Sequence, residues 1–217
     1  FLVARWLATR IFPTEDMRAP PLNLDDDARR AGRWYGALLG LAMGLHHFLD
    51  EMGLTFGWSE AAGNVILFPL VVVAALLLWR LGRLLLQHAE ENVEDTGEET
   101  YRGRMTRLLA RLLVVLSVAS PVLAAVGYVS LSKFLLFPSV LSLMVLASLV
   151  VLQRVVVELY ALLSGNRDGA ADSLIPVLVG FVLVLLSVPV VALIWGARVT
   201  DLTELWTQFV DGITIGN

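Results

Sequence analysis

The fold is decided by the stretch NVILFPLVVVAALLLW, which runs from Asn64 to Trp79 and has no ionisable side chain in sixteen residues. A helix needs roughly 20 apolar residues to cross a hydrocarbon core of ~30 Å, and neighbouring residues extend the run to about that length. Similar stretches recur along the chain, and almost every charge lies between them. Because lipid permits only helices and closed barrels, the sequence predicts an all-α integral membrane protein.

The composition indicates the same class of protein. Hydrophobic residues make up 57% of the chain and charged residues only 17%, whereas soluble domains have roughly 25% charged residues. The absence of cysteine excludes disulfides, thiolate metal sites and a cysteine nucleophile. Lys133 is the only lysine among sixteen basic residues, a bias that is typical of GC-rich bacterial genomes.

Five complete transmembrane helices are predicted, and a partial helix precedes them. The five cover about residues 31–49, 61–81, 108–128, 134–153 and 174–195. In the first, small residues at every fourth position leave a groove for close helix packing, namely Gly32, Gly36, Gly40 and Gly44. Residues 1–13 have the pattern of the end of an earlier transmembrane helix that Pro13 stops, so we interpret the chain as part of a longer polypeptide.

These helices divide the chain into helical hairpins and connecting segments. Residues 31–88 form the first predicted hairpin, residues 108–163 the second, and residues 174–197 the fifth complete helix. The expected connections are a cytoplasmic connector at 14–30, an acidic and basic cytoplasmic loop at 89–107, a cytoplasmic loop at 164–173 and a lead-in to further chain at 213–217.

The basic residues assign one face of the membrane to the cytoplasm. The turn at 50–60 has no Lys or Arg, and the turn near Ser130 has only Lys133. The other ends of the helices carry Arg29, Arg30, Arg33, Arg80, Arg83, Arg102, Arg104, Arg107, Arg111, Arg154 and Arg167. By the positive-inside rule, the protein is predicted to be a multi-pass protein of the bacterial inner membrane, with the fifth helix leaving on the outer face.

A repeat of the hairpin is visible in the sequence. Leu67-Phe68-Pro69 opens the second span, and Leu136-Phe137-Pro138 opens the fourth span 69 residues later. In the odd-numbered spans, Pro121 and Pro189 follow similar Ser-Val sequences and lie 68 residues apart. We interpret this as one helical hairpin used twice and begun a third time. The alternative is chance recurrence of Leu, Val and Pro in apolar helices.

Ionisable side chains that would lie midway through the membrane are almost absent from the sequence. Pumps and carriers need ionisable side chains there, and Glu158, one turn after Arg154, is better explained by a surface ion pair. No phosphate-binding loop, nucleophile elbow or His-Glu zinc pattern occurs. We therefore expect no enzymatic activity, no cofactor, no metal, no nucleic acid and no small-molecule substrate.

The one suggestive polar cluster contains two histidines. His46 and His47 precede Asp50 and Glu51, and a metal or haem site is one interpretation. Such a site needs a partner histidine at the same depth, whereas His88 lies at the opposite membrane face. An interfacial histidine pair near the outer headgroups is therefore favoured.

Two charged segments each have two interpretations. The acidic run at 90–99 is either a calcium or partner site or, as we favour, a solvated loop that keeps a turn off anionic lipid. The arginines either mark topology or also bind lipid headgroups at about 1 kcal/mol per basic residue. The residues predicted to contact lipid at this face are Arg80, Arg83, Arg102, Arg104, Arg107 and Arg111.

The C-terminal segment at 200–212 is predicted to be an amphipathic helix. Asp201 is the expected N-cap, with Glu204 three residues later. One apolar stripe follows at helical spacing, made of Leu202, Leu205, Trp206, Phe209 and Val210. The helix either lies in the outer membrane interface, with Trp206 and Phe209 in contact with lipid, or packs on the rest of the protein.

The end of the chain carries a family resemblance. WTQFVDGITIG, residues 206–216, resembles the segment just before the pore module in large bacterial members of the small-conductance mechanosensitive channel (MscS) family. The preceding hydrophobic hairpins with arginine-rich cytoplasmic turns are similar to the extra membrane helices of those proteins. The resemblance covers the whole chain in architecture and the last dozen or so residues in motif.

The resemblance implies a peripheral part of a channel subunit that senses membrane tension and releases ions or osmolytes on hypo-osmotic shock. It implies partners as well, which are membrane lipids and identical subunits in a homoheptamer. Kinks at Pro69, Pro121, Pro138 and Pro189 would let the hairpins curve. The alternatives are a membrane scaffold or assembly subunit without a channel role, and a carrier, which the lack of mid-membrane charge disfavours.

Overall fold

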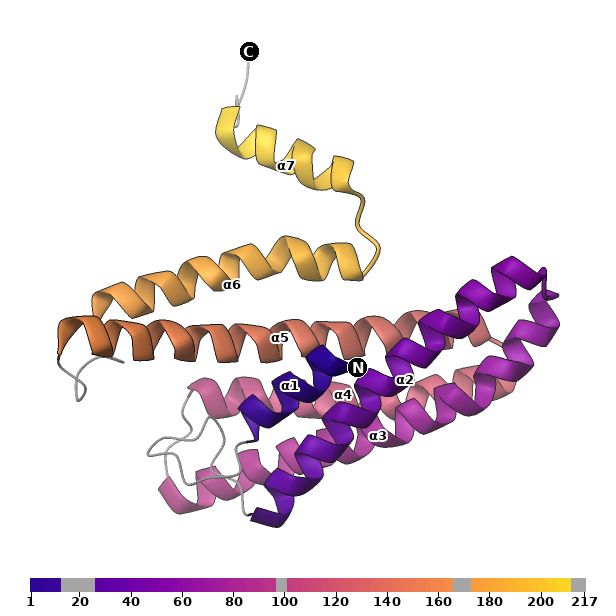
Figure 1. Ribbon diagram of the computed structural model, residues 1–217, viewed down its shortest axis with the longest axis horizontal. Coiled ribbons are helices and arrows are strands. Elements are labelled where there is room, and N and C mark those ends of the chain that lie inside the picture. The colour runs from indigo at the N-terminus through magenta and orange to yellow at the C-terminus, as the bar shows by residue number, and fades with distance from the viewer. Residues whose placement is uncertain (13–25, 97–100, 166–172, 212–217) are drawn as a thin grey trace. The chain divides into compact units, whose positions relative to one another are not determined.

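The computed structural model describes residues 1–12, 26–96, 101–165 and 173–211, and these form seven α-helices (Figure 1). Among them, the side chains of residues 88, 90–96, 101, 102, 205, 206 and 209–211 are not described. The helices are α1 (Leu2–Ile11), α2 (Asp26–Phe56), α3 (Glu60–Thr96), α4 (Tyr101–Val126), α5 (Val129–Ser164), α6 (Leu174–Ile194) and α7 (Val199–Asp211). No strand occurs in the described ranges, so the predicted all-α class is confirmed for them.

Four of these helices are long and apolar enough to cross a membrane. They are α3 over Glu60–Gln87, α4 over Gly103–Val126, α5 over Val129–Ser164 and α6 over Leu174–Ile194. Helix α2, predicted as the first complete span, is a helix of 31 residues but does not reach the same apolar level. Its glycines and the pair His46 and His47 dilute the aliphatic residues. The chain is thus a multi-pass membrane protein, and a fifth span at α2 stays a prediction.

Some helix boundaries differ from the predicted segments. Helix α3 continues to Thr96, and α4 begins at Tyr101, so most of the predicted loop at 89–107 is helical. Ala and Glu are good helix formers, and no Gly or Pro interrupts the acidic sequence before Gly97. The charge of this segment was therefore compatible with helix. The side chains of the acidic run lie outside the described part of the chain.

The chain divides into two compact units, Phe1–Ala147 and Ser148–Asn217. In the first unit, α3 supplies the centre of the core, because one of its faces is buried at helical spacing. Val71, Ala74 and Leu78 are all at most 1% exposed. The same core cluster includes Leu39 of α2, Leu113 of α4 and Leu136 of α5.

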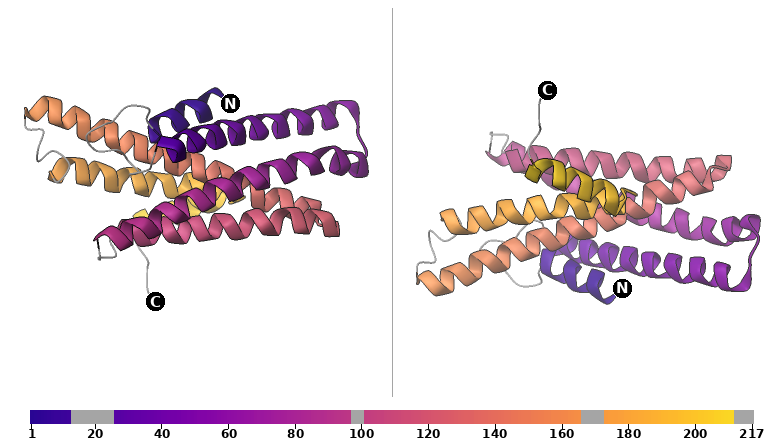
Figure 2. Two further views of the ribbon diagram at one scale, coloured as in Figure 1. Left: turned by 90° about the horizontal axis from the view of Figure 1, so that it is seen from below. Right: turned by 90° about the horizontal axis from the view of Figure 1, so that it is seen from above.

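Helix α1 packs closely along α2 in the antiparallel direction (Figure 2). The predicted glycine groove is confirmed at three of its four positions, and the fourth, Gly44, faces open space. The contacts pair Gly40 with Ala4, Gly36 with Ala8 and Gly32 with the ring of Phe12. At the end of α1, the Arg33 guanidinium donates a 2.9 Å hydrogen bond to the Phe12 carbonyl oxygen.

The turns after three of the helices have the same hydrogen-bonding pattern. Their spacing along the chain matches the hairpin repeat seen in the sequence. Gly57, Gly127 and Gly196 follow α2, α4 and α6, and each has a positive φ, of 62°, 107° and 91°. These turns lie 70 and then 69 residues apart. In each, the next residue donates its backbone N–H to a carbonyl five residues earlier, as in a Schellman cap. The bonds are Trp58 to Gly53 at 3.0 Å, Tyr128 to Leu123 at 2.8 Å and Ala197 to Ala192 at 3.0 Å.

The repeat extends to buried and hydrogen-bonded side chains. Leu67 and Val71 of α3 are buried, as are Leu136 and Val140 of α5, 69 residues later. In α4 the Ser117 hydroxyl donates to the Val114 carbonyl at 2.7 Å, and in α6 the Ser187 hydroxyl donates to the Val184 carbonyl at 2.7 Å. These matches favour a repeated hairpin over chance recurrence.

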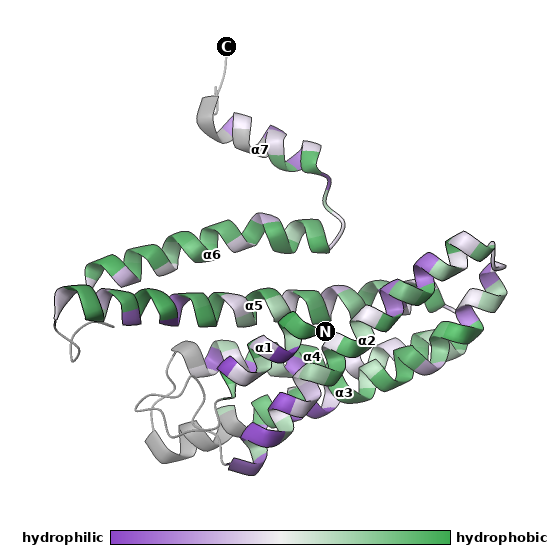
Figure 3. Cartoon of the chain, in the orientation of Figure 1, coloured by the Kyte–Doolittle hydropathy of each residue, from purple (hydrophilic) through white to green (hydrophobic). Residues whose placement is uncertain are grey.

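Apolar residues predominate along the membrane-length helices (Figure 3), and most of them are not buried within the chain. In the most apolar part of α6 no residue is buried, and in the corresponding parts of α3, α4 and α5 at most 28% are buried. In water such exposure would be unfavourable. In lipid such exposure would carry no comparable cost.

Candidate functional site

The predicted lipid-binding arginines gather at one end of the α3–α4 pair. The two helices approach closely at Gly82, where a side-chain carbon added to the glycine would lie 3.1 Å from Val114 Cγ2 and 3.3 Å from Leu113 Cβ. This antiparallel contact brings the last turns of the α3 span beside the start of α4. Five of the six predicted residues are described there, namely Arg80, Arg83, Arg104, Arg107 and Arg111.

The exposure of these arginines is as expected for side chains at the boundary between the membrane and water. Arg80, Arg83 and Arg111 are exposed, and the Arg83 guanidinium lies 5.1 Å from the centre of the Trp79 ring. A cation stacked on an aromatic ring can keep its apolar stem in lipid and its charge at the headgroups. The Arg102 side chain lies outside the described residues. We call the five described residues the arginine edge, namely Arg80, Arg83, Arg104, Arg107 and Arg111. Lipid binding by the arginine edge remains a prediction.

The four predicted hinge prolines all lie inside helices. Pro69 is in α3, Pro121 in α4, Pro138 in α5 and Pro189 in α6. A proline removes one backbone donor inside a helix, and nearby serine side chains satisfy backbone groups in membrane helices. Two of the prolines have a buried serine beside them in the sequence, and each serine hydroxyl donates to the carbonyl four residues before itself, Ser120 to Leu116 at 2.7 Å and Ser139 to Leu135 at 2.6 Å. A hinge role stays a prediction.

Helix α7 begins earlier than predicted. It starts at Val199, so Asp201 is not the N-cap but the third residue of the helix. There its Oδ2 accepts the Arg198 backbone N–H at 3.3 Å, which is the backward half of a capping box. The side chains of Trp206 and Phe209 lie outside the described part of the chain, so their predicted contact with lipid is untested.

The two histidines have different surroundings. The His46 ring stacks on Phe137 of α5, with 3.6 Å between ring centres and parallel planes, whereas His47 is exposed. No group of three metal-ligating side chains occurs in the part of the chain that the structure describes. His46 therefore has a packing contact between α2 and α5.

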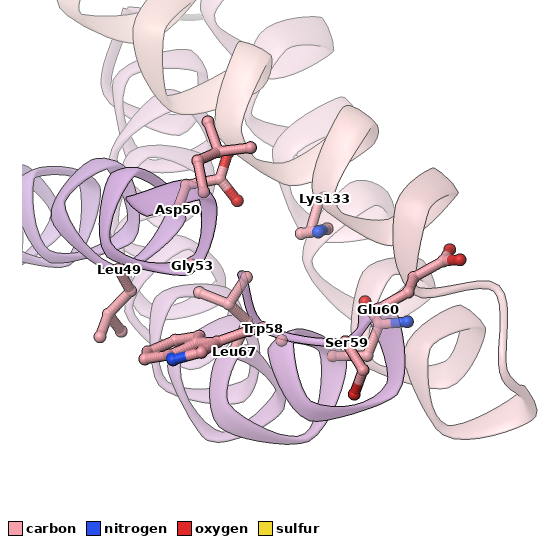
Figure 4. A pocket seen from close by; sticks show the side chains of 11 residues that line it. Leu49, Asp50, Gly53, Trp58, Ser59, Glu60, Leu67 and Lys133 are labelled. Atoms are coloured by element: carbon pink, nitrogen blue, oxygen red, sulfur yellow. The ribbon is translucent and has the colours of Figure 1, made fainter. Parts of the chain in front are cut away.

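A polar cavity lies one turn beyond this stack. His46 and Asp50 are four residues apart on α2, and Phe137 and Lys133 are four residues apart on α5. Because the helices run antiparallel, Asp50 and Lys133 face the same space, a cavity of about 270 Å³ (Figure 4). The start of α3 completes it with Trp58, Ser59, Glu60 and Asn64.

This cavity was not predicted from the sequence. In the sequence, Asp50 and Glu51 stand out only as neighbours of the histidines, and Lys133 only as the single basic residue near the turn at Ser130. Pairing α2 with α5 requires the helix register, which the sequence does not contain. One signal is present in the sequence, because the only lysine of the chain lies at the start of a long helix and no other ionisable residue follows it until Arg154.

In the second unit, a glutamine links two membrane helices. Gln153 Nε2 of α5 donates to the Pro176 carbonyl oxygen of α6 at 3.0 Å. Gly180 allows this approach, since a side-chain carbon there would lie 2.6 Å from Gln153 Oε1. Nearby, Arg154 and Glu158 form the predicted ion pair at 3.7 Å.

Comparisons of this chain with protein-family models, with curated proteins and with solved structures gave no match.

Proposed function

We propose that this chain is the peripheral, lipid-facing region of a tension-gated channel subunit of the MscS family in the bacterial inner membrane. The family assignment depends on the resemblance of residues 206–216. The pore-lining helix of the channel would follow this segment, and identical subunits would assemble as a heptamer around that pore. The arrangement of helices supports this proposal independently of the resemblance.

The observation that carries the proposal is the outward-facing apolar surface of a repeated hairpin. No more than 28% of the most apolar part of each membrane-length helix is buried within the chain. A region of this kind occupies a large area in the plane of the membrane. If its in-plane area differs between two conformations, tension shifts the population toward the larger one.

The in-helix prolines supply a means of changing that area. Pro69 and Pro138 occupy equivalent positions in the repeat, and Pro121 and Pro189 lie in the partner helices. A helix can bend at a proline because one backbone hydrogen bond is missing. The arginine edge at Arg80 and Arg83 would hold one end of the hairpin at the headgroups while the rest tilts.

The test is electrical recording from membrane patches that contain the complete subunit. Pressure ramps should open a pore, and the double variant Pro69→Ala/Pro138→Ala should change the opening threshold. The double variant Val73→Ala/Leu152→Ala is the matched control, because both residues are exposed on the same two helices, and it should leave the threshold unchanged.

Two outcomes would contradict the proposal. Equal thresholds for the proline variant and the original protein would remove the hinge mechanism. A complete subunit that never conducts under tension would remove the channel function and favour the membrane-scaffold alternative. Images of the purified assembly address the stoichiometry, for which sevenfold symmetry is expected.

A further inference from the structure

The cavity between the ends of α2, α3 and α5 presents opposite charges that do not pair with each other. Lys133 is half-buried, and Asp50 and Glu60 line the same cavity (Figure 4). Across the described residues, no ion pair joins Lys133 to either carboxylate. A cation that has lost part of its hydration gains more from a bound counter-ion than an open surface charge does. The cavity is thus suited to a ligand that carries both signs of charge.

The size and the walls of the cavity define that ligand further. Its volume of about 270 Å³ lies just under the range of roughly 300–1,000 Å³ for drug-sized ligands. A small polar group therefore fills it. The half-buried Trp58 ring is one wall, and an aromatic face attracts ammonium groups. Leu54 lies at the same cavity and is 77% exposed, so an apolar side chain borders its mouth.

The start of α3 adds an anion-binding element. Ser59 caps this helix, since its Oγ accepts the Ala62 backbone N–H at 3.3 Å. The first N–H groups of a long helix and its dipole favour negative charge. Glu60 is the first residue of this helix and its exposed carboxylate also lines the cavity, so it competes for these N–H groups and the phosphate contact is assigned to Lys133. The exposed Asp50 supplies the chemistry of an ammonium site.

We propose that this cavity binds a phosphoethanolamine group, with its phosphate at Lys133 and its ammonium at Asp50. A phosphoglycerol group would leave Asp50 without a cation. A phosphocholine group carries a cation but has no N–H to donate to the carboxylate. The proposal does not depend on the channel function, because it concerns only the contacts of residues in the first unit.

The group has two possible sources, a phosphatidylethanolamine lipid and a soluble molecule such as glycerophosphoethanolamine. The exposed Leu54 at the mouth supports the lipid, whose acyl chains would leave the cavity there. The positive-inside assignment puts this end of the hairpin at the outer membrane surface, where headgroups are at the right depth.

Native mass spectrometry of the purified protein in detergent tests the proposal. Phosphatidylethanolamine, phosphatidylcholine and phosphatidylglycerol with identical acyl chains are added at equal concentration, and bound lipid is counted. We expect phosphatidylethanolamine to bind about tenfold more tightly than the others, which corresponds to about 1.4 kcal/mol. Competition by glycerophosphoethanolamine distinguishes the lipid from a soluble ligand. If the site binds the soluble compound, the compound displaces the bound lipid; if the site is specific for the lipid, the lipid stays bound.

Matched variants assign the two charges. Lys133→Met should weaken binding of all three lipids, and Lys133→Arg should restore it. Asp50→Asn should remove the preference for phosphatidylethanolamine without weakening phosphatidylglycerol. Glu51→Gln is the control, because Glu51 adjoins Asp50 and does not line the cavity, and it should change neither. Equal binding of the three lipids by the original protein, or a preference that survives Asp50→Asn, would overturn the proposal.

Discussion

Gly40 of α2 lies so close to Ala4 of α1 that a methyl group added at Gly40 would overlap the Ala4 side chain. One turn away, a carbon added at Gly36 would lie 3.0 Å from Ala8 Cβ. Small residues on both helices thus allow their backbones to approach, as in close helix packing within membranes. The absence of native cysteine makes this contact accessible to disulfide experiments.

Replacing Gly40 should separate α1 from α2. In an Ala8→Cys/Gly36→Cys background, we expect rapid disulfide formation, and Gly40→Leu should suppress it because overpacking costs roughly 1–3 kcal/mol. Non-reducing gel mobility measures the cross-link. Gly44→Leu is the control, since a side-chain carbon added at Gly44 would meet no atom within 4 Å apart from the adjoining backbone of its own helix. Cross-linking that persists in Gly40→Leu would contradict the packing.

The predicted topology can be tested with single cysteines. Ser59→Cys and Ser130→Cys lie at the turns assigned to the outer face, and Ser164→Cys lies at the end of α5 assigned to the cytoplasm. An impermeant maleimide added to whole cells should label the first two and spare the third. Permeabilised cells provide the control in which all three react. Labelling of Ser164→Cys in intact cells would reverse the orientation or break the alternation.

Substitution at Gly180 should act through Gln153. Gly180→Ala displaces the Gln153 amide and so removes its bond to the Pro176 carbonyl, which we expect to cost about 0.6 kcal/mol, the average for hydrogen bonds in membrane helices. In a Gln153→Leu background the same change should cost almost nothing. Unfolding in mixed micelles completes this double-mutant cycle. Equal costs in the two backgrounds would show that Gln153 is not the residue that Gly180 accommodates.

The three turn glycines should respond alike to substitution. Gly57, Gly127 and Gly196 each have a positive φ, where a residue with a Cβ is disfavoured by about 1–2 kcal/mol. Alanine at each position should lower the free energy of unfolding by a similar amount. Gly103→Ala is the control, because that glycine is helical with open space around it, and alanine should be neutral or stabilising there. Widely different costs at the three turns would contradict their equivalence.

Much of the fold was predictable from the lengths of the apolar segments and from the glycine, proline and charged residues that end them. The apolar run at 64–79 placed α3, and the predicted segments at 174–197 and 200–212 correspond closely to α6 and α7. The acidic charge after Ala89 predicts a solvated loop, but Glu has a high helix propensity and α3 continues to Thr96. The glycine groove of α2 is visible in the sequence, but its partners Ala4 and Ala8 are not, because the sequence does not give the register between α1 and α2.

The candidate sites were predictable only where their residues lie on helices that follow each other in the sequence. The arginine edge depends on residues close together in sequence at the ends of α3 and α4, so its members were identified. The cavity at Asp50 and Lys133 joins helices that are far apart in the chain. Its formation depends on how α2 and α5 are aligned, and no spacing in the sequence encodes that alignment.

The nearly equal spacing of the turns at Gly57, Gly127 and Gly196 has a consequence for how such chains can grow. Each interval contains one descent and one ascent through the bilayer, so a duplicated or deleted interval leaves both flanking segments on their original sides. Gene variants that gain or lose whole intervals would therefore keep their downstream domains correctly oriented, whereas half an interval would invert everything that follows it.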